Sequence, residues 1–225
     1  MERLRVGLRR HWLVWATQAG AVLPLLWTAW DWQVGNLSIN PIDDLTDRTG
    51  VTALNLLLLS LAVTPLQTVT GLRSLTPLRK PLGLWAFAYA VIHLLIFIGL
   101  DYGFDWRLIW LDGLPTKLYI VAGLAALLIL TPLAITSTRG WMKRLGKWWK
   151  HLHRLAYLAG ILAVVHYIWV AKVAYGAPTL YAVMLAVLLA ARILWVRTRL
   201  AHLRTLWSLP RRGARTAERP SKATS

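Results

Sequence analysis

The sequence predicts an all-α integral membrane protein, built as a bundle of six transmembrane helices with both termini in the cytoplasm. Of its 225 residues, 57% are hydrophobic and only 16% are charged, which is too few charges to cover the surface of a water-soluble protein. The apolar residues are gathered into long uninterrupted runs rather than spread along the chain. The 14 Trp residues also suit a membrane protein, because indole rings accumulate at the bilayer interface.

Six apolar runs without Asp, Glu, Lys or Arg are the predicted helices. Each approaches the roughly 20 residues that cross about 30 Å of hydrocarbon. None has the period-two alternation of a membrane β-strand, and lipid cannot satisfy unpaired backbone groups, so a helix is predicted for each run. In chain order the runs are Trp12 to Trp30, Thr49 to Leu66, Pro81 to Leu100, Leu118 to Thr138, Leu155 to Ala171 and Val173 to Ala191.

The count of six depends on whether the first run is retained and whether the last two runs are separate helices. The first follows an Arg-rich start, as a signal peptide would, but its length and the absence of a small-x-small cleavage site after it favour a retained helix. The fifth and sixth are separated by little more than Tyr175-Gly176-Ala177-Pro178. The count of six therefore depends on this short turn.

The distribution of Lys and Arg predicts the orientation. These residues concentrate before the first run, in the second and fourth connections and after the sixth run. The other connections hold all seven Asp residues and only four basic ones, which are Arg48, Arg107, Lys117 and Lys172. By the positive-inside rule both termini are cytoplasmic.

Three regions follow from this pattern. Residues 1–11 are the cytoplasmic N-terminus, residues 12–200 are the six-helix transmembrane domain, and residues 201–225 are a basic cytoplasmic tail. The tail is rich in Arg, Ser, Thr, Ala and Pro, a composition that predicts partial disorder.

The composition also excludes several kinds of function. The absence of Cys excludes disulfides, thiolate nucleophiles and iron–sulfur clusters, so any metal must be held by His or carboxylate groups. The net charge of +17 would suit nucleic-acid binding only if the basic residues formed a patch on a soluble face. Here they lie between apolar runs, so membrane lipid and not nucleic acid is the expected surrounding.

Two histidines inside the runs are the strongest candidates for chemistry. His93 lies about 12 residues into the third run and His166 about 11 residues into the fifth. Both runs lead outward from the cytoplasm, so the two imidazoles should lie at similar depth. Two facing neutral imidazoles can supply both axial ligands of a haem iron, an arrangement that favours electron transfer over oxygen binding. The alternative is a core histidine bonded to a carbonyl or hydroxyl group, but the matched depth and the lack of Asp or Glu in any run favour the haem.

A second candidate level lies where the fifth run begins, at His151 and His153. From His153 to His166 is about 20 Å along a helix axis, a separation suited to two stacked redox centres. On a straight helix His151 lies closer than His153 to the direction of His166, whereas a kink near Gly160 could bring His153 round. Either residue could instead be an interfacial histidine. A cytochrome with two haems and four His ligands would place a second His in the third helix about 14 residues before His93, but that position is Arg79. A second haem on the cytoplasmic side therefore uses a different ligand or is absent.

Three segments resemble a known family. They are NPIDDLTDRTGVTALNLLLLSLAVTPL (Asn40 to Leu66), LRKPLGLWAFAYAVIHLL (Leu78 to Leu95) and LGKWWKHLHRLAYLAGILAVVHYIWVAK (Leu145 to Lys172). Together they are similar to the MsrQ family, formerly YedZ, which falls in the ferric-reductase-like transmembrane group. The resemblance covers about residues 10 to 200 and does not extend to the Arg-rich tail.

The resemblance implies a six-helix b-type cytochrome of the bacterial inner membrane that is associated with FMN. It implies that electrons come from the respiratory chain, as quinol, and pass to the periplasmic molybdopterin subunit MsrP, which reduces methionine sulfoxide in oxidised proteins. The family's haem ligands fall on His93, His153 and His166, with His151 as a minor alternative. One haem b is thereby expected, and a second is possible.

The residues that hold FMN or quinone are not predicted. The basic fourth connection could face a flavin phosphate, but the positive-inside rule already explains its charges. The acidic connections, including Asp43, Asp44 and Asp47, are expected to form part of the docking surface for the partner. The chain itself shows no nucleophile–base pair, Walker loop or carboxylate dyad, so substrate chemistry is expected on another protein.

Two other functions remain open at this point. One is a stand-alone ferric or quinone reductase cytochrome that uses the same histidines without a molybdenum partner. The other, from a different class, is a small transporter or assembly factor whose histidines bind a metal ion or protons.

Overall fold

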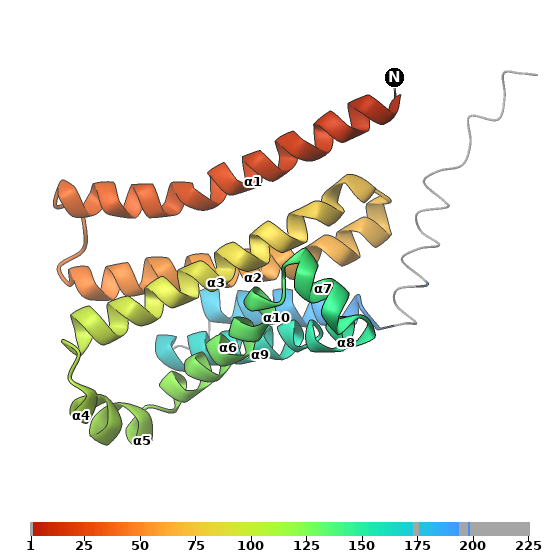
Figure 1. Ribbon diagram of the computed structural model, residues 1–225. Coiled ribbons are helices and arrows are strands. Elements are labelled where there is room, and N and C mark those ends of the chain that lie inside the picture. The colour runs from red at the N-terminus through yellow and green to blue at the C-terminus, as the bar shows by residue number, and fades with distance from the viewer. Residues whose placement is uncertain (1, 173–175, 194–197, 199–225) are drawn as a thin grey trace, which may run out of the picture.

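The computed structural model describes residues 2–172, 176–193 and 198, with side chains for all of these except residues 2–11 and 112–114. The regular structure of this part of the chain is entirely helical, without any strand (Figure 1). The predicted basic tail, residues 201–225, lies outside the described residues. The all-α prediction is thereby confirmed for the described part.

Six longer helices coincide with the six predicted runs and lie alongside one another as a bundle (Figure 1). The third continues beyond its last α-helical residue as a π-helical turn, η2 (Phe97–Asp101). The six helices are α1 (Glu2–Gln33), α2 (Pro41–Thr70), α3 (Arg79–Ile96), α6 (Leu118–Ile135), α9 (Leu155–Ala171) and α10 (Ala177–Ala190).

Four segments in the described part are long and apolar enough to cross a membrane. They are Pro41–Thr70, Arg73–Asp101, Leu118–Ile135 and Lys147–Ala171. The apolar helix α10 has only 14 described residues, and in α1 Trp, Thr and Gln dilute the aliphatic residues. The described part of the chain therefore supports four crossings on length and composition, and six crossings stay a prediction.

Short helices fill the connections, which the sequence did not predict. The segment between α3 and α6 folds into three of them, and two more precede α9. A further 3-10 helix joins α2 to α3. These elements are η1 (Arg73–Leu78), α4 (Trp106–Leu108), η3 (Ile109–Gly113), α5 (Leu114–Thr116), α7 (Arg139–Leu145) and α8 (Lys147–Leu152).

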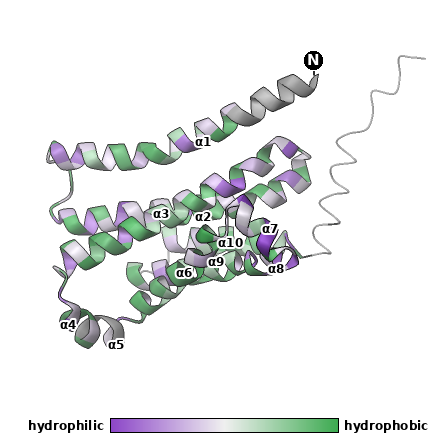
Figure 2. Ribbon diagram, in the orientation of Figure 1, coloured by the Kyte–Doolittle hydropathy of each residue, from purple (hydrophilic) through white to green (hydrophobic). Residues whose placement is uncertain are grey.

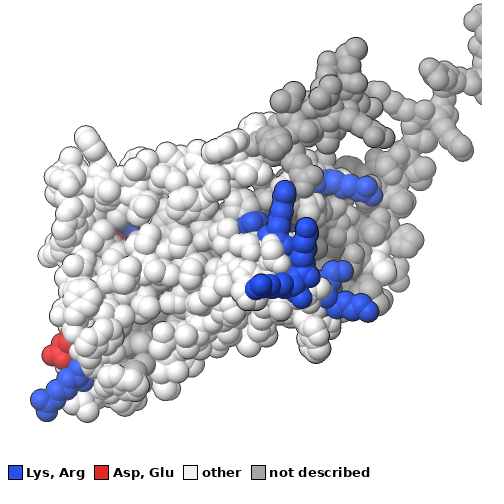
Figure 3. All heavy atoms as spheres, in the orientation of Figure 1, with Lys and Arg blue, Asp and Glu red and all other residues white. Residues whose placement is uncertain are grey.

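Opposite charges mark the two ends of the bundle. Figure 2 shows hydrophobic residues along the middles of the helices, and Figure 3 shows most of the visible Lys and Arg at one end, with acidic and basic atoms side by side at the other. We call this the basic end; it carries the Lys and Arg residues of α7 and α8. The other end, where the α1–α2 connection lies, carries Asp31, Asp43, Asp44 and Asp47, and we call it the acidic end.

Two pairs of helices form the centre of the bundle. Helix α2 packs most extensively against α3, and α6 against α9. Small residues allow close packing there, because Ala86 and Ala159 are almost completely buried. Helix α1 joins this core through Ala21, whose carbonyl accepts a 2.7 Å hydrogen bond from the hydroxyl of buried Tyr89 on α3.

Arg192, just after α10, binds a backbone carbonyl of α2 that a proline leaves without its helical hydrogen bond. Pro65 has no amide hydrogen, so the carbonyl of Leu61 lacks its usual helical donor. Arg192 fills this role, because its Nη2 donates to the Leu61 carbonyl at 2.5 Å. Its guanidinium also lies 4.6 Å from the centre of the Tyr157 ring and donates to that residue's hydroxyl. One arginine thus ties the end of α10 to both α2 and α9.

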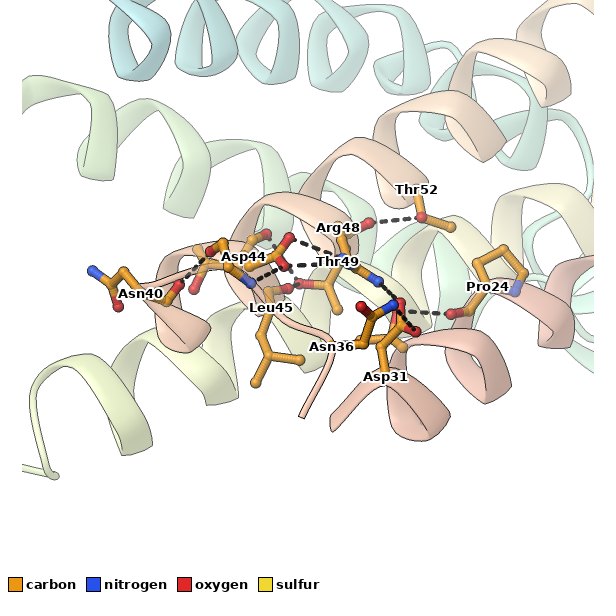
Figure 4. A network of polar contacts seen from close by, with 12 residues as sticks. Pro24, Asp31, Asn36, Asn40, Asp44, Leu45, Arg48, Thr49 and Thr52 are labelled. Atoms are coloured by element: carbon orange, nitrogen blue, oxygen red, sulfur yellow. Dashed lines mark hydrogen bonds and ion pairs between the residues drawn. The ribbon is translucent and has the colours of Figure 1, made fainter. Parts of the chain in front are cut away.

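An ion-pair network ties α1 to α2 at the acidic end (Figure 4). Arg48 donates to the Asp31 carboxylate at 2.5 Å and to Asp44 at 2.9 Å. The Asp31 side chain is only 5% exposed, so its negative charge needs the nearby Arg48 cation to offset the cost of burial. Asn36 in the connecting turn donates to the same carboxylate at 3.3 Å. The start of α2 is therefore held firmly against the end of α1.

Candidate functional site

His93 of α3 and His166 of α9 face each other inside the bundle. Their ring centroids are 5.9 Å apart, and the ring planes are nearly perpendicular, at 87°. The two helices come from different central pairs, so the rings meet where the α2–α3 pair adjoins the α6–α9 pair. The structure thus brings together the two histidines that matched depth predicted to face each other.

Each imidazole is oriented by one backbone carbonyl. The Nδ1 of His93 lies 3.0 Å from the Thr46 carbonyl oxygen, and the Nδ1 of His166 lies 2.6 Å from the Tyr119 carbonyl oxygen. A carbonyl only accepts, so both rings carry their proton on Nδ1. The Nε2 lone pair of each ring is then free to bind a metal, because metal-binding histidines commonly donate their other ring N–H to a carbonyl or carboxylate that fixes the ring.

Two glycines make these close contacts possible. Gly50 lies one helical turn after Thr46, and Gly123 lies one turn after Tyr119. A Cβ atom on Gly50 would lie 3.0 Å from Nδ1 of His93, and one on Gly123 would lie 2.8 Å from Nδ1 of His166. Any larger residue would therefore push the imidazole off its carbonyl.

The two halves of the site have the same spacing in the chain. In each half the histidine is 47 residues after the residue whose carbonyl accepts its proton. The glycine occupies the same intermediate position in both, so each helix pair contributes one acceptor, one glycine and one histidine. This correspondence covers only three positions in each half, so it does not amount to an internal sequence repeat.

The arrangement fits a haem iron. A metal–imidazole bond of about 2.0 Å on each side places two axial ring centroids about 6 Å apart, close to the separation found here. Among the residues that the structure describes, no three His, Cys, Asp or Glu side chains converge on a metal position. A bare ion would gain only two protein ligands from this pair, whereas a porphyrin supplies the remaining four.

His153 lies at a different level, near the basic end. Its Nε2 lies 3.1 Å from the hydroxyl of buried Thr136, at the end of α6. That hydroxyl already donates to the Pro132 carbonyl at 2.6 Å, so it accepts from Nε2 of His153. The ring also stacks on Trp149, with centroids 4.1 Å apart. In His153, unlike the central pair, Nδ1 is the nitrogen left with the free lone pair.

His151 is exposed, and its ring lies beside Trp148. The straight-helix comparison of His151 with His153 does not apply, because α8 ends at Leu152 and α9 begins at Leu155. The interruption therefore lies at His153 itself, while Gly160 is buried within an unbroken α9. The break turns His153 toward α6 and leaves His151 at the surface.

The sequence predicted neither the carbonyl partners of the two histidines nor the pairing of the acidic residues at the acidic end. The acceptor carbonyls of Thr46 and Tyr119 belong to the backbone, so no residue type marks them. Asp44, which we expected on the docking surface, is engaged by Arg48, and Asp43 accepts a 2.6 Å bond from Asn40. Asp47 is exposed at the same end.

Several known proteins resemble this chain over most of its length. Residues 49–164 match the family model described as the ferric reductase like transmembrane component. A protein of Xanthomonas axonopodis pv. citri is 45% identical over 80% of this chain and 84% of its own length. A protein of Rhodospirillum rubrum is 44% identical over 79% of this chain and 86% of its own. A third, from Caulobacter vibrioides, is 40% identical over 80% and 85%. All three are named protein-methionine-sulfoxide reductase heme-binding subunit MsrQ.

Proposed function

The chain belongs to the MsrQ family of heme-binding subunits, and we propose that it is a b-type cytochrome that carries electrons from the quinol pool to a periplasmic molybdopterin methionine-sulfoxide reductase, MsrP. In this role it supports the repair of oxidised periplasmic proteins. The chemistry on methionine sulfoxide takes place on the partner, and this chain is the electron-transfer subunit of the complex.

The observation that carries the proposal is the pair of facing imidazoles, each with Nδ1 bonded to a carbonyl. His93 and His166 would hold the iron of one haem b through their Nε2 atoms. When bound there, haem would supply one-electron transfer, and the two histidines would be its protein ligands. The carbonyls of Thr46 and Tyr119 fix the ring tautomer and raise the basicity of the ligand nitrogens.

A second haem is proposed at His153, near the basic end. Its ring is fixed by Thr136 and Trp149, and the hydrogen bond from Nε2 to Thr136 leaves Nδ1 as the candidate ligand atom. His151 is the minor alternative for this ligand. The resemblance to the family also implies FMN, which we retain as a proposed cofactor without assigning residues to it.

The proposed location is the bacterial inner membrane, with six crossings and both termini in the cytoplasm. The positive-inside rule supports this orientation, because the two termini and the second and fourth connections together carry most of the Lys and Arg residues. The acidic end then faces the periplasm and the partner. Exposed Asp47 and Asp43 are available there for docking, whereas Asp44 is already paired with Arg48.

The direct test is the reduced-minus-oxidised spectrum of the purified protein, with haem quantified per chain. We expect a b-type spectrum in the wild type. His93→Ala and His166→Ala should each remove the central haem, because each deletes one axial ligand. His153→Ala should leave that haem in place and lower the haem content only if the second site exists.

A wild type without haem would overturn the proposal and favour the transporter or assembly-factor function. A haem-containing protein that reduces ferric chelates or quinones but never the purified MsrP-type partner would favour the stand-alone reductase. Flavin released from the purified protein by denaturation would separately test the FMN proposal.

A further inference from the structure

A polar side chain lies in the middle of α2, away from both ends of the bundle. Asn55 is flanked by Leu54 and Leu56, both buried, but Asn55 itself is exposed. In a transmembrane helix an exposed side chain at this position faces lipid. A carboxamide without partners in hydrocarbon costs several kcal/mol, so the position calls for a hydrogen-bonding partner.

Part of this need is met by tyrosines from two other helices. The hydroxyl of Tyr181 on α10 donates to Oδ1 of Asn55 at 2.8 Å. Tyr167 on α9 meets Tyr181 edge to face, with ring centroids 5.4 Å apart and planes at 88°. Together the three residues form a small polar and aromatic group that opens to the outside of the bundle, where α2, α9 and α10 adjoin.

The carboxamide nitrogen of Asn55 remains without an acceptor among the residues that the structure describes. Two other polar side chains of the same helix, on either side of Asn55, bond to backbone carbonyls. The hydroxyl of Thr52 donates to the Arg48 carbonyl at 2.7 Å, and that of Ser60 donates to the Arg79 carbonyl at 2.9 Å. Asn55 therefore differs from Thr52 and Ser60, because its two N–H donors lie at the exposed surface of the bundle and are available to an external ligand.

The group is adjacent to the proposed haem ligands. Tyr167 directly follows His166 on α9, so their side chains leave the helix about 100° apart and at nearly the same level. His166 faces the central site, and Tyr167 faces α10. A redox molecule held beside Tyr167 would lie roughly one helix diameter, about 10 Å, from the central site.

We propose that Asn55, Tyr181 and Tyr167 bind the head group of the quinol that supplies electrons to this protein, an inference that rests on the proposed function. A quinone ring carries an oxygen that can accept from the Asn55 N–H groups. A quinol hydroxyl can donate to the Tyr181 oxygen, whose own hydrogen is used by Asn55. The ring can pack against Tyr167, and the apolar tail can follow Leu59, which lies one turn along α2 and is 53% exposed.

Oxidation of one quinol to quinone releases two electrons and two protons. The electrons go singly to the one-electron carrier of the proposed function. The exposed Asp47 carboxylate, about two helical turns before Asn55 on α2, would accept a proton at the acidic end. Proton release would then occur on the side where the partner docks.

The test uses the full-length haem-loaded protein in lipid nanodiscs, with decylubiquinol as the probe under anaerobic conditions. The rate of haem reduction is followed optically in wild type, Asn55→Leu and Tyr181→Phe. We expect each variant to be slower by about tenfold, the factor that corresponds to one lost hydrogen bond of about 1.4 kcal/mol. Ser60→Ala, which removes a hydroxyl from another face of α2, should match the wild type.

Two further measurements separate the possible failures. Dithionite should reduce the haem fully in every variant, which shows that the central site is intact. A photoreactive azidoquinone should label peptides of α2 and α10 in wild type and less in Asn55→Leu. Wild-type rates in both variants, with labelling elsewhere, would overturn this site and leave the proposed function standing. A wild type that dithionite reduces but decylubiquinol does not would overturn the quinol donor, and this inference with it.

Discussion

Gly123 and Gly50 decide how closely each histidine approaches the carbonyl that accepts its proton. We expect Gly123→Ala to displace His166, because the new methyl group would lie 2.8 Å from Nδ1. The hydrogen bond that raises the basicity of the ligand would weaken, so the ferric form would lose stabilisation. Haem content per chain should fall, and any haem retained should have a higher reduction potential. Gly50→Ala should act in the same direction through His93.

A matched control is available on α3. A Cβ atom on Gly83 would meet only the Ser60 hydroxyl, at 3.4 Å. Gly83→Ala should therefore leave both the spectrum and the potential unchanged, although it makes the same change in a helix interior. Replacing glycine by alanine there favours the helix by about 0.5–1 kcal/mol, so a loss of haem in Gly123→Ala cannot come from helix propensity. Unchanged haem content and potential in Gly123→Ala would contradict the role we give this residue.

Single residues show what the sequence could and could not predict about the site. His93 and His166 could be paired because an ionisable group inside an apolar run is costly, and two at matched depth suggest one ligand. Their carbonyl partners lie 47 residues away in the chain, and only the packing of α2 on α3 and of α6 on α9 reveals them. Asn55 is marked in the sequence as a carboxamide in the middle of an apolar run, but it is not ionisable, so the cost of a buried charge does not single it out.

At the scale of elements, the junction between α1 and α2 depends on one ion pair. We expect Arg48→Gln to destabilise the protein by about 2 kcal/mol, because it leaves the Asp31 carboxylate buried without its cation. The value is below that of a fully buried pair because the Arg48 side chain is 31% exposed. The measurement is the denaturation midpoint of the purified protein in detergent.

The double variant Asp31→Asn with Arg48→Gln tests the cause. It removes both charges, so much of the lost stability should return. Arg107→Gln, at an exposed arginine of α4, is the control and should have little effect. If Asp31→Asn with Arg48→Gln is less stable than Arg48→Gln alone, the buried charge is not the reason for the loss.

The elements themselves were predicted better than their ends. Apolar runs fixed the positions of the six longer helices, because lipid leaves no other form for such a segment. Their boundaries follow local chemistry that hydropathy does not contain. Helix α2 begins at Pro41, eight residues before the predicted start of its apolar run, through the polar turn that carries Thr46. The break at His153, which settles where that ring points, also has no marker in the apolar pattern.

At the scale of the whole molecule, the central site is the seam between two helix pairs. Each pair supplies one histidine oriented by one carbonyl, so the proposed haem would join the two halves. Helices α1 and α10 flank this core and are fixed to it by Tyr89 and by Arg192. This arrangement places the proposed quinol site on the side of α10, away from α1.

The number and direction of the crossings is the whole-molecule property that most needs a test. As described, α10 has 14 residues, about 21 Å of helix against about 30 Å of hydrocarbon.

The chain has no Cys, so single cysteines can be introduced without a background. Ile39→Cys and Ala177→Cys, at exposed positions of the acidic end, should react with a membrane-impermeant maleimide in intact spheroplasts. Glu2→Cys, Lys143→Cys and Ser225→Cys should react only after permeabilisation, since the positive-inside rule places them in the cytoplasm. Labelling of Ser225→Cys together with Ala177→Cys before permeabilisation would mean that α10 does not cross, and a fully inverted pattern would mean that the electrons travel toward the opposite face.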